Sequence, residues 1–203
     1  TGAKQARWSS DGFELTFAVN HLSHQALTEG LIPLLIKSNS PRVIITSSEV
    51  HNPKSPGGKV GKKAGLGNLS GLYNGAGFEM IDGNIFSADK AYKDSKLCNI
   101  LFARELSNHL SSMNIRMPII AWAPGLIIPK HKNGFFRYSR QYNELGQRLF
   151  SLVARDILRI TETPENAGKI LSDLVLEPKM NNLSFIYMSN KIISPGQKIF
   201  EET

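Results

Sequence analysis

Tyr92 and Lys96 are the residues with the clearest potential for chemistry. They lie four residues apart in a segment predicted to be helical, so their side chains project from one face, one turn apart. A phenol has a pKa of about 10 and by itself transfers protons poorly at neutral pH. We expect the ammonium group of Lys96 to lower the pKa of Tyr92 and so allow proton transfer to a substrate. Because this spacing also arises by chance in many helices, the pair needs support from other residues.

Further polar residues and a turn point to the same crevice. Ser48 follows a short, β-branched run that predicts a buried strand, and open α/β sheets bind ligands at the carboxyl ends of their strands. Asn20 lies inside another predicted helix, where an amide needs a reason to be buried. After a second predicted strand the chain turns sharply, and the backbone amides of this turn are candidates for contact with a nicotinamide cofactor. The turn consists of Pro124, Gly125, Leu126 and Ile127.

The segments that must position these residues alternate between helix and strand. Helices are predicted over residues 11–38, 91–112 and 164–176 and within 135–160, and strands over 42–47, 117–122 and 183–188. The first helix has Ser10 or Asp11 as its expected N-cap, with Glu14 in the capping-box position. Thr163 and Pro164 mark the start of the last helix. This alternation predicts a Rossmann-like, doubly wound α/β fold with a parallel sheet.

The length and composition favour one globular domain over residues 1–203. With 203 residues, 41% of them hydrophobic and 20% charged, the chain is long and apolar enough to form a core. Residues 49–89 hold most of the 17 glycines and few helix or strand signals. Loops of this length in compact domains are usually functional or disordered. We interpret this glycine-rich segment (residues 49–89) as a large insertion within the domain, not as a second domain.

The charge and the remaining reactive side chains exclude several classes of function. The net charge is +7, but the basic residues are scattered and no nucleic-acid recognition motif accompanies them, so nucleic acid is not an expected partner. The single cysteine, Cys98, rules out a disulfide within the chain and is predicted to pack in the core. His21 and His24 have no third ligand nearby, so no metal site is predicted. No apolar run approaches the roughly 20 residues that a membrane span needs.

Together, Asn20, Ser48, Tyr92 and Lys96 resemble the Asn-Ser-Tyr-Lys tetrad of short-chain dehydrogenases/reductases. The strings "DGFELTFAVNHLSH" (residues 11–24) and "MIDGNIFSADKAYKDSKLCN" (residues 80–99) resemble, more specifically, the light-dependent protochlorophyllide reductases. The long insertion between Ser48 and Tyr92 is also characteristic of that family. Retinol-dehydrogenase-like relatives share the "NHL" and "SKL" strings but lack "AYKDSK" and the insertion.

The resemblance implies a light-driven reduction of protochlorophyllide with NADPH. A hydride would reach C17 of the pigment, and Tyr92 would donate a proton to C18. Lys96 would hold the nicotinamide ribose and tune Tyr92, Asn20 would support the helix and the proton path, and Ser48 would line the site. The resemblance also implies peripheral association with photosynthetic membranes and leaves homo-oligomers open. The expected location is the cytoplasm or thylakoid surface of a photosynthetic bacterium, or a plastid in a eukaryote.

An aromatic stretch after the Pro-Gly turn has two interpretations. In the family this region tends to cover the substrate, so its residues are candidates for packing on the flat pigment. The alternative is an ordinary surface helix anchored in the core. The residues are Phe135, Phe136, Tyr138 and Tyr142.

The chain departs from the family pattern in two respects. Ala123 and Leu126 stand where the family commonly has Tyr and Cys around the Pro-Gly turn. The first β-α-β units of the fold, with their glycine-rich phosphate loop, are not found ahead of the tetrad. We therefore expect this chain to be the C-terminal two-thirds of a short-chain reductase fold, and the natural protein to extend beyond Thr1 and beyond its last residue as well. Two alternatives therefore stay open: a light-independent short-chain reductase of an apolar, retinoid-like carbonyl, and an inactive pigment-binding homologue.

Overall fold

A computed structural model describes residues 3–73, 75–127, 145–146, 149, 152–157, 161–189 and 192–194. Its centre is a four-stranded sheet in the order β1-β2-β3-β4. The strands are β1 (Val43–Thr46), β2 (Ile119–Ala123), β3 (Phe185–Ser189) and β4 (Ile192–Ser194). The first three pair in parallel, and β4 pairs antiparallel with β3. The parallel sheet confirms the predicted fold, while β4 was not predicted.

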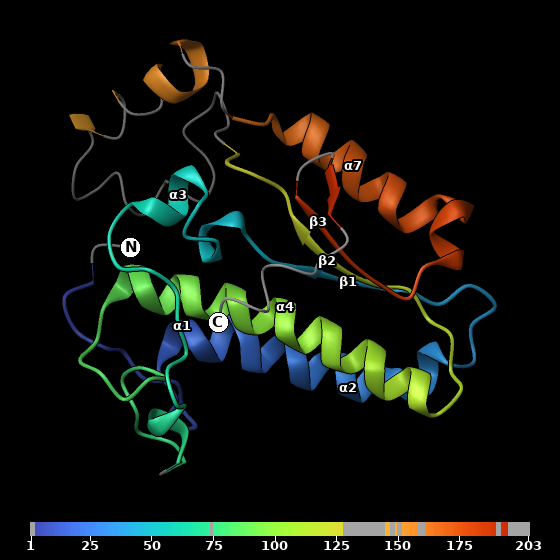
Figure 1. Ribbon diagram of the computed structural model, residues 1–203, viewed down its shortest axis with the longest axis horizontal. Coiled ribbons are helices and arrows are strands. Elements are labelled where there is room, and N and C mark those ends of the chain that lie inside the picture. Colours follow the sequence, from blue (N-terminus) through green and yellow to red (C-terminus); the bar gives the residue numbers. More distant parts are fainter. Residues whose placement is uncertain are drawn as a thin grey trace.

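Helices cover both faces of this sheet (Figure 1). One face is covered by α4 and by a run of three consecutive helices from the start of the chain. The other face is covered by α7. The run consists of α1 (Leu15–Phe17), the π-helix η1 (Ala18–Leu22) and α2 (Ser23–Leu35). The other long helices are α4 (Ala88–Ser112) and α7 (Pro164–Leu176). Short helices are η2 (Glu49–His51), α3 (Pro56–Lys59), η3 (Ser70–Leu72), η4 (Leu152–Ile157) and η5 (Pro178–Asn182).

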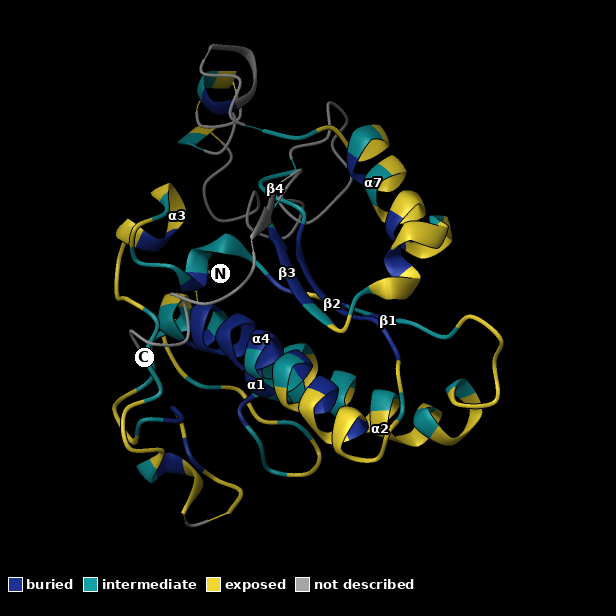
Figure 2. Ribbon diagram, turned by 45° about the vertical axis from the view of Figure 1, so that its right-hand side comes forward, coloured by how far each residue is buried: buried dark blue, intermediate teal, exposed yellow. Residues whose placement is uncertain are grey.

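The parallel strands β1, β2 and β3 pack on both faces, because their alternate residues contribute to two separate apolar cores. The core beneath α4 and α2 contains Val43, Ile45, Ile100, Leu110, Ile119 and Ala121. The core beneath α7 contains Ile120, Trp122, Ala167, Leu174, Ile186 and Met188. Figure 2 shows β2, the middle of β3 and the first half of α4 as the most continuously buried parts. The placement of Trp122 in the core is confirmed.

The first helix begins later than the sequence predicted. Glu14 is itself the N-cap, and its carboxylate accepts hydrogen bonds from the backbone amides of Thr16 at 3.0 Å and Phe17 at 2.9 Å. The capping-box prediction was wrong because the preceding residues form a turn. In that turn the Gly12 amide donates to the Ser9 carbonyl at 3.1 Å, and Gly12 has a φ of +79°.

The predicted start of α7 is confirmed. The hydroxyl of Thr163 accepts a hydrogen bond from the Asn166 amide at 3.1 Å, with Pro164 as the first helical residue. Most of residues 135–160 lie outside the described residues; within them the structure describes η4.

The glycines of the glycine-rich segment allow backbone to pack directly on backbone. A Cβ atom at Gly71 would lie 2.1 Å from the carbonyl oxygen of Met80. A Cβ atom at Gly58 would lie 1.8 Å from that of Asn52. Both distances are far below van der Waals contact, so a larger residue at either position would force the chain apart. The richness in glycine is therefore partly a packing requirement.

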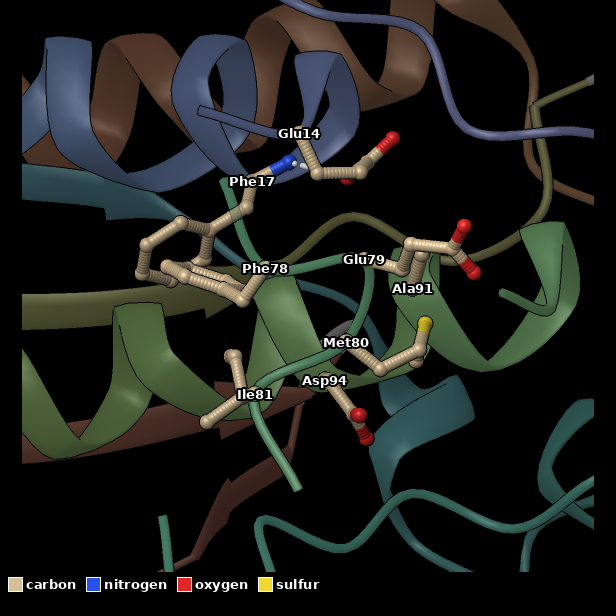
Figure 3. Close-up of a pocket in the computed structure, with 8 residues that line it drawn as sticks. All are labelled: Glu14, Phe17, Phe78, Glu79, Met80, Ile81, Ala91 and Asp94. Atoms are coloured by element: carbon tan, nitrogen blue, oxygen red, sulfur yellow. Dashed lines mark hydrogen bonds between the residues drawn. The ribbon is translucent and has the colours of Figure 1, made fainter. Parts of the chain in front are cut away.

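The glycine-rich segment also contributes side chains to a third apolar core. Residues 78–81 lie between α1 and the first turns of α4 (Figure 3). Phe78 packs edge-on against Phe17 with ring centroids 5.6 Å apart, and Ile81 and Cys98 are buried beside them. The cavity between these elements has a volume of about 10 Å³, room for a single water molecule. The prediction that Cys98 packs in the core is confirmed.

Candidate active site

Tyr92 and Ser48 meet at the carboxyl edge of the sheet. Tyr92 is the fifth residue of α4, and Ser48 lies two residues beyond the end of β1. The Ser48 side chain lies close enough to the Tyr92 phenol to influence its pKa. Burial raises the pKa of Tyr92, and the polar side chain of Ser48 offsets part of this increase. The structure thus joins two residues that are 44 positions apart in the sequence.

Lys96 lies beside this pair but does not control the pKa of Tyr92. Its Nζ atom is 5.8 Å from the centroid of the Tyr92 ring and donates to the Thr46 carbonyl at 3.2 Å. Burial lowers the pKa of Lys96 itself. The prediction that the ammonium lowers the pKa of Tyr92 was wrong, because the burial of the phenol outweighs the favourable influences on it. Tyr92 therefore stays protonated at neutral pH, which is the form that a proton donor needs.

Asn20 reaches the site through a π-helical turn. It lies in the middle of η1, and π-helical turns are frequent at functional sites. The Asn20 amide nitrogen donates to the Ser95 hydroxyl at 3.1 Å, and that hydroxyl donates to the Tyr92 carbonyl at 2.7 Å. Asn20 is thus connected to the backbone of Tyr92 through one side chain, Ser95.

Asn99 is a second link that the sequence reasoning missed. Fully buried in α4, it donates from Nδ2 to the Thr46 carbonyl at 3.1 Å and pairs through Oδ1 with Nδ1 of His21 at 3.1 Å. The carbonyl of Thr46 therefore receives hydrogen bonds from both Asn99 and Lys96. The signal was available, since Asn99 follows Tyr92 by two helical turns and a polar residue on a buried face needs partners.

The turn after β2 lies at the same sheet edge, because β1 and β2 are parallel. The strand ends at Ala123, which is fully buried in the core beneath α4, and Gly125 adopts a left-handed conformation with a φ of +82°. The Leu126 carbonyl accepts a hydrogen bond from the Glu162 amide at 2.9 Å, and Ile127 bridges the same residue. The sharp break at Pro124 is confirmed, and a role of this turn in cofactor binding stays a prediction.

The structure brings together the four predicted catalytic residues. Asn20 is joined to the backbone of Tyr92 through Ser95, and Ser48 and Lys96 lie beside the phenol. The predicted substrate residues, Phe135, Phe136, Tyr138 and Tyr142, lie outside the described residues. The assembled group offers a protonated phenol, an ammonium group one turn away and a polar edge of parallel strands. Such a group suits proton donation to a bound substrate, with Lys96 and residues 124–127 available to hold a cofactor.

The chain is similar to chloroplastic protochlorophyllide reductases over almost its whole length. It is 35% identical over 193 residues to protochlorophyllide reductase B of Oryza sativa subsp. japonica, covering 92% of this chain and 46% of that protein. It is 34% identical over 183 residues to the enzyme of Chlamydomonas reinhardtii, covering 88% and 44%. The chain is a homologue of the protochlorophyllide reductases. It spans about half the length of these curated relatives, and no family model matches it.

Solved structures of short-chain dehydrogenases share the fold of this protochlorophyllide reductase homologue. A 3-alpha-hydroxysteroid dehydrogenase from Pseudomonas sp. B-0831, complexed with NADH, matches with a TM-score of 0.58 at 18% identity, covering 94% of this chain and 69% of that one. A short chain dehydrogenase from Salmonella enterica matches with a TM-score of 0.50 at 18% identity, covering 87% and 51%. Among the described helices, none has the length and apolar character of a membrane span.

Proposed function

We propose that this protein reduces protochlorophyllide to chlorophyllide with NADPH in a light-driven reaction. The observation that carries the proposal is the closeness of the Tyr92 phenol to the Ser48 side chain, with Lys96 one turn away, at the carboxyl edge of the sheet. Similarity to protochlorophyllide reductases over about nine-tenths of the chain supports the choice of substrate.

The described residues fit the nicotinamide end of the cofactor. Within the described part of the chain, the Lys96 ammonium donates one hydrogen bond, to Thr46, and an ammonium has three hydrogens to donate. Lys96 would therefore hold the ribose hydroxyls, and the backbone of residues 124–127 would contact the carboxamide. When bound, NADPH supplies the hydride that C17 of the pigment receives.

The chain's own residues would supply the proton. Tyr92 would donate its hydroxyl proton to C18, and its raised pKa keeps that proton in place until the pigment accepts it. Ser48 would orient the phenol. Asn20 would hold the backbone of Tyr92 through Ser95. Together one hydride and one proton convert the C17–C18 double bond into a single bond.

The proposed location is a plastid or the cytoplasm or thylakoid surface of a photosynthetic bacterium. The names of the curated relatives place them in chloroplasts, which supports the plastid. The net charge of +7 would favour contact with an anionic membrane surface. Fractionation of plastids with an antibody to this chain would test both statements.

A dark-binding experiment tests the proposed function. The complete protein is mixed with protochlorophyllide and NADPH in darkness and then exposed to a single flash. The expected result is chlorophyllide absorbance, which the substitution Tyr92→Phe should reduce by about 100-fold or more, the usual contribution of a proton donor. Bound pigment that stays unreduced, with no effect of Tyr92→Phe, would identify an inactive pigment-binding protein. Reduction of an apolar carbonyl in darkness, without pigment reduction, would identify a light-independent reductase.

A further inference from the structure

Two buried charged residues, Lys93 and Asp94, lie between Tyr92 and Lys96 on α4. Each is only 1% exposed. A buried charge is tolerated only when it is paired and hydrogen-bonded, so the partners of these residues show what this part of the helix holds. In both cases the partners belong to the glycine-rich segment or to the first turn of α4.

Lys93 holds the part of the glycine-rich segment that follows α3. Its ammonium donates to the carbonyls of Val60 and of Lys62, the latter at 2.8 Å, and forms an ion pair with Asp89 at 3.0 Å. These three partners match the three hydrogens of an ammonium group. Gly61 lies between the two carbonyls with a φ of +70°, and a Cβ atom there would lie 2.4 Å from the Asp89 carboxylate. Glycine therefore allows this close approach.

Asp94 and Lys90 hold both peptide groups of Gly65. The Asp94 carboxylate accepts a hydrogen bond from the Gly65 amide at 2.9 Å and pairs with Lys90. Lys90 in turn donates to the Gly65 carbonyl and forms an ion pair with Asp82 at 3.0 Å. The segment is thus attached to α4 on both sides of Gly65.

The first turns of α4 depend on these contacts. The N-cap residue is Ser87, and among the described residues its side chain caps no backbone amide of the helix. Figure 3 shows residues 78–81 of the glycine-rich segment supporting the same turns, with Ala91 and Asp94 facing them. Because Tyr92 lies in the second turn of α4, any movement of these turns would move its hydroxyl relative to Ser48.

We propose that Lys93 and Asp94 are positioning residues that clamp the glycine-rich segment to the first turns of α4 and thereby fix Tyr92 against Ser48. The "AYKDSK" string supplies the side chains of Lys93 and Asp94, and the glycine-rich segment supplies the carbonyls and the amide that they bind. The role in catalysis rests on the proposed function, whereas the clamp itself does not.

The test compares the substitution Lys93→Met with Lys169→Met in the complete protein. Lys169 is exposed on α7, so it controls for the loss of one positive charge. The first measurement is the rate of trypsin cleavage after the exposed residues Lys59, Lys62 and Lys63 under native conditions. We expect Lys93→Met to raise this rate roughly tenfold, because local opening becomes easier, and Lys169→Met to leave it unchanged.

The second measurement follows the position of Tyr92 directly. Ultraviolet titration of each variant, minus that of its Tyr92→Phe derivative, isolates the ionisation of this phenol. Since burial raises the pKa of Tyr92, we expect Lys93→Met to shift the titration back toward the ordinary value of about 10. The third measurement is the chlorophyllide yield per bound pigment after one flash. In Lys93→Met this yield should fall at least several-fold. A loss of folded protein alone would not change it, because the yield is counted per bound pigment.

The outcomes separate the inference from the proposed function. Faster cleavage with an unchanged Tyr92 titration would overturn the positioning role, and unchanged cleavage would overturn the clamp. If the unmodified protein makes no chlorophyllide, the proposed function fails, while cleavage and titration still decide the inference. If Lys93→Met does not fold, Asp94→Asn replaces it in the same three measurements. Asparagine keeps the size of the side chain and an acceptor for the Gly65 amide. We therefore expect smaller changes in cleavage rate, Tyr92 titration and chlorophyllide yield, in the same directions.

Discussion

Replacing Asn99 with leucine is expected to destabilise the folded protein and to change the position of Lys96. Asn99 joins three elements: its amide nitrogen donates to Thr46 at the end of β1, and its oxygen pairs with His21 in η1. Leucine can make neither contact. After the replacement, Lys96 no longer shares the Thr46 carbonyl with Asn99. The position of the Lys96 side chain should therefore change as well.

The magnitude follows from counting the groups that lose a partner. The Nδ1 atom of His21 would lose its acceptor inside the protein, and an unsatisfied buried polar group costs about 1–3 kcal/mol. The Thr46 carbonyl keeps its hydrogen bond from Lys96 at 3.2 Å. Losing the bond from Asn99 should therefore cost only the net value of one hydrogen bond, about 1 kcal/mol. The sum is about 2–4 kcal/mol, which for a chain of this size lowers Tm by about 4–16 °C.

Thermal and urea unfolding of the complete protein measure this effect. The matched control is Asn108→Leu, the same substitution at an exposed position of α4, which should change the free energy of unfolding by no more than about 0.5 kcal/mol. If Asn99→Leu proves as stable as Asn108→Leu, the hydrogen bonds of Asn99 to Thr46 and His21 do not stabilise the fold.

Three further predictions concern other parts of the fold. Burial raises the pKa of Cys98 to about 12, so a thiol reagent at about pH 8 should label it only after unfolding; rapid labelling of the folded protein would contradict its burial. Gly71→Ala should lower the free energy of unfolding in urea by about 1–3 kcal/mol, because the new Cβ atom would meet the Met80 carbonyl. Gly65→Ala, with open space around it, should leave this free energy nearly unchanged, and equal effects of the two substitutions would contradict the close packing at Gly71. Burial lowers the pKa of His51, partly offset by its bond to the Ser48 carbonyl. The unfolded chain therefore binds this proton first, and the stability that His51 contributes is complete above about pH 6.5 and falls below it. His51→Asn should reduce the difference between urea midpoints at about pH 7.5 and about pH 5.5, and an unchanged difference would contradict this assignment.

Local sequence signals were sufficient to predict the three parallel strands, the long helices and the shared helix face of Tyr92 and Lys96. Helical periodicity put both residues on one face of α4, and a run of β-branched residues predicted β1. The start of α7 was equally local, since Thr163 caps an amide only three residues away. These features depend on residues close in sequence, where spacing alone determines which groups can meet.

The strand β4 and the cap of the first helix were not predictable in the same way. Three residues that pair antiparallel with β3 give too short a pattern to stand out from a loop. Glu14 became the N-cap because a turn around Gly12 occupies the residues that the capping box would have used. The cap was decided by a neighbouring turn and the strand by its pairing with β3, and both are visible only once the chain is folded.

The sequence by itself determined which residue types reach one helix face, and therefore that Tyr92 and Lys96 form a pair. Only the tertiary structure decided the state of that pair. Burial of the phenol raises its pKa, although the spacing with Lys96 suggested the opposite, because desolvation depends on all the elements that cover Tyr92. The backbone partners of Lys93 and Asp94, and both partners of Asn99, likewise lie about 30 to 80 residues away in the sequence, so these contacts arise from the packing of distant segments.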